Sequence, residues 1–190
     1  MPVAITRNQR YDRMTKAIMK QVCTTDSSCI DVGCHTGEIL DVMIQVASQG
    51  KHLAFEPLPD FYNNLKQKYA ASSCVIYPFA LSHQKGKSTF HYVKSNPAYS
   101  GLRKRAYAKP NEEIVLIETE TAQLDDLLPA DQSVQFIKID VEGAELQVLQ
   151  GATRVISQWH PYIVFEFGLG ASDYYDSTPE KIFSLLRSCG

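Results

Sequence analysis

The 190-residue sequence lacks the features that mark several specialised classes of protein. Its 19 Lys and Arg residues nearly balance its 21 Asp and Glu residues, so a nucleic-acid partner is not expected. Its five cysteines are odd in number and form no Cys-x-x-Cys pair, so neither a disulfide framework nor a zinc site is indicated. No apolar run reaches the roughly 18 residues of a membrane span, and Met1 to Arg10 lacks the apolar core of a signal peptide. We therefore expect one soluble, cytoplasmic domain over residues 1–190, with no membrane partner.

What the sequence does contain is an alternation of short apolar runs with helix-like segments. Four of the apolar runs each end in one carboxylate: Asp31, Glu56, Asp140 and Glu166. All strands of an open parallel sheet point the same way, so these acids should gather along its carboxyl edge, where such folds bind ligands. The pattern predicts an α/β fold with a mainly parallel sheet and helices on both faces.

Two segments depart from this alternation. An N-terminal helical segment is expected within residues 1–28, and a hairpin or lid insertion within residues 86–121, with half-exposed strands at 88–93 and 114–121. Between those strands lies the basic run 103–109. It is either a lid that binds an anionic or glycan substrate or a solvated loop, and the solvated loop is the favoured interpretation.

A glycine turn from Gly33 to Gly37 follows the first of the four apolar runs. Glycine there lets the backbone turn tightly and approach a ligand. Glu56 lies 19 residues after Gly37, at the end of the next strand, where a carboxylate can accept hydrogen bonds from ribose hydroxyls. The alternative is that Asp31 only caps the turn and Glu56 is a solvated strand end. The combination favours a ribose-bearing cofactor.

Two such cofactors compete for this turn. A nicotinamide dinucleotide requires Gly-x-Gly-x-x-Gly, but counting from Gly33 the later glycine positions hold His35 and Glu38. A carboxylate in the first helical turn would repel a pyrophosphate. S-adenosylmethionine has a ribose and cationic groups but no phosphate, so Asp31 suits its ammonium and Glu56 its ribose. The charges favour S-adenosylmethionine.

Lys138 and Asp140 share one face of the third acid-ended strand. A lysine in a buried strand must be paired. We expect its partner to be Asp140, or Glu166 on a neighbouring strand.

The same strand leads into the residues expected to carry chemistry. Asp140 or Glu142 would border the methyl group and the acceptor, while Gly143 would let helix and ligand approach closely. A hydroxyl acceptor must lose a proton, which a carboxylate or His160 could take. A helix cap or salt bridge is an equally good role for Glu142, and packing near Trp159 is the better role for His160. We favour Asp140.

Several dispersed motifs, in order and spacing, resemble the FkbM-type methyltransferase family. The similarity runs from about Cys29 to Phe167 and rests on Asp31-Val32-Gly33, Ala54-Phe55-Glu56-Pro57, Ala80-Leu81-Ser82, the stretches 121–128 and 136–145, Val148 to Ala152, and the late strand 161–167 with Glu166.

The resemblance implies a class I methyltransferase (Rossmann-like) fold that uses S-adenosylmethionine, and usually O-methylation of a sugar or small metabolite, with a small-molecule or glycan acceptor. It also implies roles for residues. Asp31, Gly33 and Gly37 would shape the cofactor turn, and Glu56 with Pro57 would bind the ribose at the end of the next strand. Ala80 and Leu81 would border the adenine, and the reacting edge would consist of Asp140, Glu142 and Gly143. His35 replaces a common Asn, so it either donates to the cofactor carboxylate or is a turn residue.

The sequence also departs from the family at its end. It stops where the last two strands would begin, so the C-terminal strands are expected to be missing. The edge beyond Glu166 would then be exposed, and a partner, including a second copy in a homo-oligomer, could cover it. Asp140, Glu142, Glu166 and His160 form no close ligand cluster in the sequence, so no metal is expected. A non-catalytic cofactor-binding module, and less readily an NAD-dependent oxidoreductase, are the alternative functions.

Overall fold

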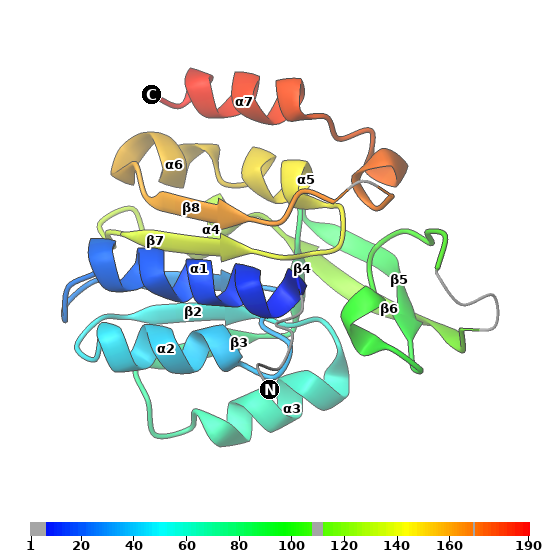
Figure 1. Ribbon diagram of the computed structural model, residues 1–190, viewed down its shortest axis with the longest axis horizontal. Helices are drawn as coiled ribbons and strands as arrows, with labels where there is room; N and C mark the ends of the chain where they lie inside the picture. The colour runs from blue at the N-terminus through cyan, green and yellow to red at the C-terminus, as the bar shows by residue number, and fades with distance from the viewer. Residues whose placement is uncertain (1–6, 108–111, 169) are drawn as a thin grey trace, which may run out of the picture.

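The computed structural model describes residues 7–107, 112–168 and 170–190. Its main sheet has five parallel strands in the order β3-β2-β1-β7-β8 (Figure 1). They are β1 (Cys29–Val32), β2 (His52–Phe55), β3 (Cys74–Tyr77), β7 (Phe136–Ile139) and β8 (Tyr162–Phe165). The predicted α/β fold is confirmed. Of the four predicted acids, Asp31 lies near the end of β1, while Glu56, Asp140 and Glu166 directly follow β2, β7 and β8.

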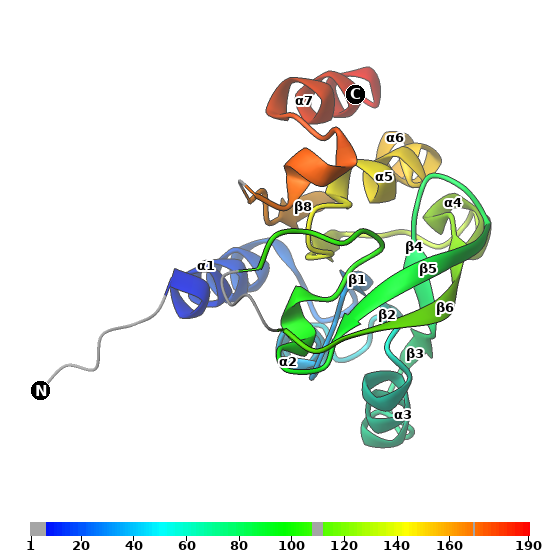
Figure 2. The same cartoon turned by 90° about the vertical axis from the view of Figure 1, so that its right-hand side faces the viewer.

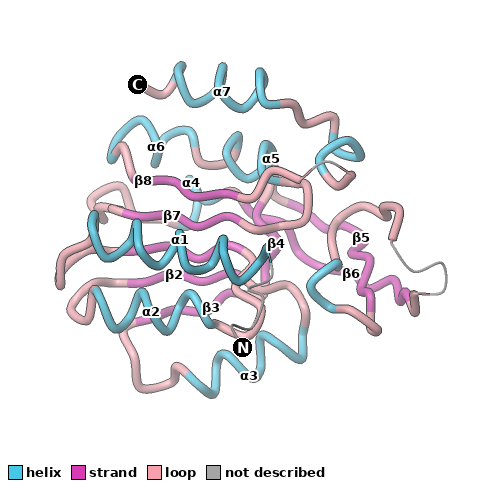
Figure 3. The backbone as a smooth tube through the Cα atoms, viewed as in Figure 1, coloured by secondary structure: helices cyan, strands magenta, loops and turns pink. Residues whose placement is uncertain are grey.

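Helices cover both faces of this sheet, as the tube in Figure 3 shows. Side chains alternate along each strand, so Ile30 and Val32 face one core and Cys29 the other. The first core contains residues of α4 (Leu124–Leu127), α5 (Glu145–Gln150), α6 (Thr153–Trp159) and α7 (Pro179–Ser188). The second contains residues of α1 (Arg7–Val22), α2 (Glu38–Val46) and α3 (Pro59–Lys68).

A second, smaller sheet stands beside the main one (Figure 2). Its three strands, in the order β4-β6-β5, are β4 (Phe79–Leu81), β6 (Ile114–Ala122) and β5 (Gly86–Val93). The pair β5 and β6 is the predicted antiparallel hairpin. Although residues 75–81 form one mainly apolar run in the sequence, Pro78 lacks an N–H and separates β3 of the main sheet from β4 of the small one.

Residues 142–157 do not form one continuous helix. Glu142 and Gly143 have positive φ angles of 58° and 110°, so the helix begins only at Glu145. It ends at Gly151, where a Cβ atom would overlap the carbonyl oxygen of Ser82. Two short helices, α5 and α6, result.

Strand β8 is an edge of the main sheet, and Tyr162 on it is 52% exposed. In the described part of the chain after β8, the structure has a 3-10 helix, η2 (Ser172–Tyr175), and α7, but no strand. Association through this edge stays a prediction. No helix within the described ranges is long and apolar enough to cross a membrane.

Candidate functional site

A cavity of about 600 Å³ opens at the carboxyl end of the main sheet, bordered also by α1 and the small sheet. Most of the residues singled out in the sequence line it together: Asp31, Gly33, His35, Glu56, Pro57, Ala80, Leu81, Asp140 and Glu142. The predicted edge of acids is therefore one continuous wall of a single cavity.

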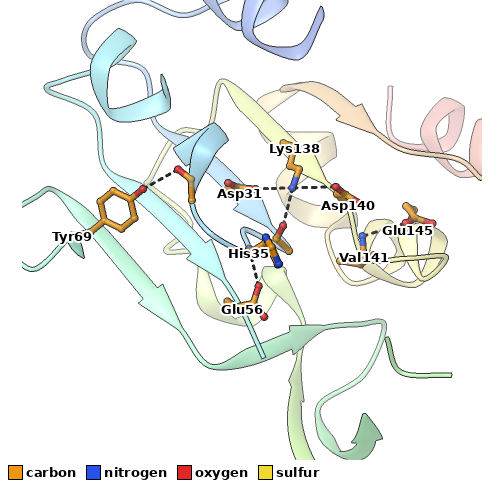
Figure 4. A network of polar contacts seen from close by, with 10 residues as sticks. Asp31, His35, Glu56, Tyr69, Lys138, Asp140, Val141 and Glu145 are labelled. Carbon is orange, nitrogen blue, oxygen red and sulfur yellow. Dashed lines mark hydrogen bonds and ion pairs between the residues drawn. The ribbon is translucent and has the colours of Figure 1, made fainter. Parts of the chain in front are cut away.

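Lys138 organises the centre of that wall (Figure 4). Its Nζ lies 3.3 Å from Asp31 Oδ1 and 3.6 Å from Asp140 Oδ2, and it donates to the carbonyl oxygen of Gly33 at 2.8 Å. Burial alone would lower the pKa of Lys138, but the two carboxylates raise it overall. Asp140 is the partner expected from the sequence, whereas Asp31 was missed. Glu166 forms no ion pair with Lys138 in the structure.

The glycine turn brings two strand ends into close contact. Gly33 has φ 75°, and a Cβ atom on it would overlap the carbonyl oxygen of Asp140. Gly37, with φ 81°, instead packs against α3, where the Tyr69 hydroxyl donates to its carbonyl oxygen at 2.9 Å. Gly33 therefore borders the cavity, while Gly37 shapes the turn from outside it.

Glu56 is a carboxylate almost removed from water, with 4% of the residue exposed. Its Oε2 accepts from the His35 N–H at 2.8 Å (Figure 4), and its Oε1 accepts from the Leu58 N–H at 3.0 Å. Burial raises the pKa of Glu56 to about 7, although these two donors act in the opposite direction. Each oxygen retains lone-pair capacity, because a carboxylate offers about four acceptor positions. The group is suited to a ligand that brings hydroxyl donors.

His35 takes part through its backbone as well as its ring. Its φ is 46°, and its ring stacks on Phe61 with the centroids 4.4 Å apart. Nε2 is buried and has no hydrogen-bond partner, and burial lowers the pKa of the imidazole. The ring is therefore a neutral group at the cavity wall with one polar atom left for a ligand.

The other half of the cavity is acidic. Asp140, Glu142 and Glu166 follow β7 and β8, and Asp12 reaches the same space from α1. Burial raises the pKa of Glu142 to about 8; Arg105 lowers it and Asp140 raises it further. Burial, then Asp140, also raises the pKa of Glu166. Asp12 was not predicted, because nothing local links α1 to the sheet edge.

Carboxylates can also hold metals, but the described ranges contain no group of three or more His, Cys, Asp or Glu side chains arranged for one.

Glu145 has a structural place in this region. It is 1% exposed, and its Oε1 accepts from the Val141 N–H at 3.3 Å (Figure 4) and from the Gly143 N–H at 3.1 Å. Gly143 does not line the cavity; its missing Cβ leaves space for the backbone of Ala171. Glu145 and Gly143 therefore hold the turn that presents Asp140 and Glu142.

The basic loop is only partly solvated. Lys104 is exposed, as the favoured interpretation expected, but the Arg105 side chain is 13% exposed and its Nη1 lies 2.7 Å from Glu142 Oε2. Arg103 donates its backbone N–H to Tyr175 Oη at 2.8 Å. Lys109 lies outside the described residues. The description as a solvated loop is wrong for Arg105, because the loop is bonded to a distant segment, η2, and Arg105 contacts Glu142.

His160 lies away from the cavity. It caps the C-terminal end of α6 with φ 45° and precedes β8, whereas Glu166 follows β8. Six residues of extended chain span about 20 Å. The His160 ring lies beside Gly190 instead. Because parallel strands place their two ends at opposite edges, we do not retain His160 as a base.

Known proteins resemble this chain in sequence and in fold. Residues 31–190 match the family described as the Methyltransferase FkbM domain. Methyltransferase sdnD of Sordaria araneosa is 29% identical over 171 residues, covering 70% of this chain and 66% of its own. Methyltransferase 1 of Beauveria bassiana (strain ARSEF 2860) is 27% identical over 149 residues, covering 66% of this chain and 58% of its own. The chain thus spans less than two thirds of the length of these two relatives.

Among solved structures, the precorrin-6y C5,15-methyltransferase of Geobacter metallireducens GS-15 superposes with a TM-score of 0.51. The two share 15% sequence identity, and the superposition covers 98% of this chain and 73% of the other. At that identity the likeness concerns the fold, which is that of the class I methyltransferases.

Proposed function

Because the chain belongs to the FkbM methyltransferase domain family, we propose that it binds S-adenosylmethionine and methylates a hydroxyl oxygen of a sugar or other small metabolite. The observation that carries the proposal is the environment of Glu56. A carboxylate 4% exposed, at a cavity wall, with two backbone donors and room for more, fits the two hydroxyls of a ribose.

The rest of the cavity suits the other parts of this cofactor. Ala80 and Leu81 offer an apolar wall for the adenine. Asp31 and Lys138 present opposite charges beside the Gly33 turn, which suits the ammonium and carboxylate of the amino-acid end. Both oxygens of Asp31 are buried, and Lys138 contacts only Oδ1, so Oδ2 would be the acceptor for the ammonium. When bound, the cofactor supplies a methyl group on a cationic sulfur.

Asp140 and Glu142 are the candidate groups for the acceptor proton. Both line the cavity at the edge of the Gly33 turn. Burial raises the pKa of Glu142 to about 8, close to the value at which a carboxylate is an effective base at neutral pH. Asp140 is held by Lys138, so it also steadies the turn.

Charge disfavours the NAD-dependent alternative. Glu38 lies in the first turn of α2 and lines the cavity, so a pyrophosphate at that helix end would meet a carboxylate. A non-catalytic cofactor-binding module is the second candidate, since the chain spans only part of its two relatives.

Calorimetry with S-adenosylhomocysteine and with NAD tests the cofactor assignment. We expect binding of the first alone. Glu56→Ala should weaken it about 10- to 150-fold, since a hydrogen bond to a charged group is worth about 1.5–3 kcal/mol. Glu118→Ala, on the exposed face of β6, is the matched control. Equal affinity in Glu56→Ala would remove the ribose assignment, and binding of NAD instead would overturn the cofactor.

Catalysis requires a separate measurement. Transfer of a labelled methyl group to members of a panel of glycans and hydroxylated metabolites should give an O-methylated product. A protein that binds S-adenosylhomocysteine but labels no member of the panel would favour the non-catalytic module.

A further inference from the structure

The loop between β5 and β6 is fastened to a distant part of the chain. We call its described residues 94–107 the lid loop. Arg103 donates its backbone N–H to Tyr175 Oη at 2.8 Å and its Nη1–H to the Tyr174 carbonyl oxygen at 2.6 Å, and the Ala106 N–H donates to Tyr174 Oη at 3.1 Å. Both tyrosines belong to η2, which follows β8. The lid loop is therefore closed over the reacting edge by bonds to η2.

This closure buries one arginine against one acid. Arg105 Nη1 lies 2.7 Å from Glu142 Oε2, with only 13% and 23% of the two side chains exposed. The guanidinium lies 4.7 Å from the ring centre of Tyr99 and 6.0 Å from that of Tyr107. Glu142 lines the cavity, but Arg105 does not. The arginine thus contacts the carboxylate from outside the cavity and leaves its inner side open to a ligand.

The other charges around Glu142 are negative. Asp140 approaches from the end of β7, Glu166 from the end of β8 and Glu145 from α5, and each disfavours ionisation of Glu142. On the η2 side the titratable group is Tyr175, whose pKa burial raises to about 12, so it stays neutral at pH 7. Arg105 is the positive group that opposes burial and these acids. A buried carboxylate without such a partner takes up a proton.

We propose that Arg105 is a positioning residue for methyl transfer, which increases the ionised fraction of the Glu142 carboxylate and keeps it facing the cavity while the lid loop is closed. This inference rests on the proposed function. The acceptor hydroxyl oxygen uses a lone pair to form the new bond to the methyl carbon, while the electrons of the broken C–S bond stay on sulfur. The O–H proton passes to a Glu142 oxygen, and water removes it when the lid loop opens. Arg105 does not line the cavity, so this role requires no contact with the acceptor or the cofactor.

A titration of the ligand-free protein tests this directly. With ¹³C-labelled glutamate, the side-chain carboxyl signal of Glu142 is assigned by its loss in Glu142→Gln and followed by NMR from about pH 5 to about pH 12, which covers the wild-type pKa of about 8 and the expected rise. Removing a partner charge at this distance shifts a pKa by about 1 to 3 pH units. We expect Arg105→Met to raise the Glu142 pKa by that amount and Arg105→Lys to keep most of the wild-type value. An unchanged pKa in a folded Arg105→Met protein would overturn the proposal.

A second variant leaves Arg105 in place. Tyr174→Phe removes the hydroxyl that accepts from the Ala106 N–H, at a residue that is 39% exposed, so the fold should persist. We expect a smaller rise in the Glu142 pKa, because a looser lid loop holds the arginine less often. This variant tests the proposal even if Arg105→Met does not fold. An unchanged Glu142 pKa in Tyr174→Phe would contradict the idea that closure of the lid loop holds Arg105 against Glu142.

The outcome is independent of the cofactor assignment. Arg105 is not at the Glu56 end of the cavity, so the affinity for S-adenosylhomocysteine should stay within about threefold in Arg105→Met. If the wild-type protein did not bind S-adenosylhomocysteine, the proposed function alone would be refuted. If it bound the ligand but Arg105→Met left the Glu142 pKa unchanged, the role of Arg105 alone would be refuted.

Discussion

Lys138 on β7 and Asp31 on β1 stand opposite each other in the parallel register, and their side chains meet at 3.3 Å. Asp31 is completely buried, and burial raises its pKa while Lys138 lowers it. Because Lys138 also binds the Gly33 carbonyl oxygen, one ammonium joins the strand that carries Asp31 to the turn that follows it.

We expect Lys138→Met to lower the free energy of unfolding by about 3–5 kcal/mol, because it leaves a buried carboxylate without its partner. Urea denaturation followed by circular dichroism measures this. Lys87→Met, at an exposed pair with Glu118, is the matched control and should change stability by about 1 kcal/mol or less.

The double variant Asp31→Asn with Lys138→Met separates charge from packing. Recovery of part of the lost stability is expected, since the buried charge is gone. A single Lys138→Met variant as stable as the wild type would show that the pair does not support the fold.

We expect Gly33→Ala to destabilise the protein and abolish cofactor binding. The new Cβ would overlap the Asp140 carbonyl oxygen, and a residue with a side chain is disfavoured at φ 75°. Thermal unfolding and calorimetry with S-adenosylhomocysteine report the two effects. Gly168→Ala is the control, because a Cβ there has no heavy atom within 4 Å and should be nearly neutral. Wild-type binding by Gly33→Ala would contradict the close approach of turn and strand.

Cofactor affinity should rise with pH near neutrality. Burial raises the pKa of Glu56 from 4.5 to about 7, so the ligand-free carboxyl is mostly protonated at pH 6 and mostly ionised at pH 8. The ionised form accepts hydrogen bonds from hydroxyls more strongly. We expect up to about tenfold weaker binding of S-adenosylhomocysteine at pH 6 than at pH 8, which is the ratio of ionised fractions for a pKa near 7.

Glu56→Gln provides the reference for this pH dependence, because its amide does not titrate. Its affinity should vary much less over the same range. An equal slope in both proteins would assign the effect to another group.

Once an acceptor is known, Glu142→Gln should reduce kcat by about 10²- to 10⁴-fold, the usual contribution of a general base. Asp140→Asn should also weaken transfer, but with a loss of stability, because Asp140 contacts Lys138. Single-turnover rates at saturating cofactor, together with melting temperatures, distinguish the two. A larger loss of rate in Asp140→Asn than in Glu142→Gln, without destabilisation, would identify Asp140 as the general base.

Local patterns were sufficient to predict the framework of the site. Short stretches of sequence determine the strand ends at Asp31, Glu56 and Asp140 and the turn at Gly33. The alternation of apolar runs with helix-like segments, and the positions of the glycines, can be read from them directly. Parallel strands then bring those ends to one edge without any knowledge of individual contacts.

Contacts between distant segments could not be predicted in the same way. The pairing of Lys138 with Asp31 depends on the register between β1 and β7, which alternation does not determine. Arg105 looks like a surface residue in sequence, and only the bonds from its loop to Tyr174 and Tyr175 bury it. We excluded His160 as a base because it precedes β8, at the opposite edge of the sheet from the cavity. The direction of the strand alone could have indicated this.

The cavity has walls from two hydrogen-bonded sheets, since Ala80 and Phe90 belong to the small sheet and Asp31 to the main one. A nucleoside bound between them would contact both sheets and hold them together. Hydrogen exchange of the backbone amides in β5 and β6 should then slow when the cofactor is bound, even at positions remote from any bound atom.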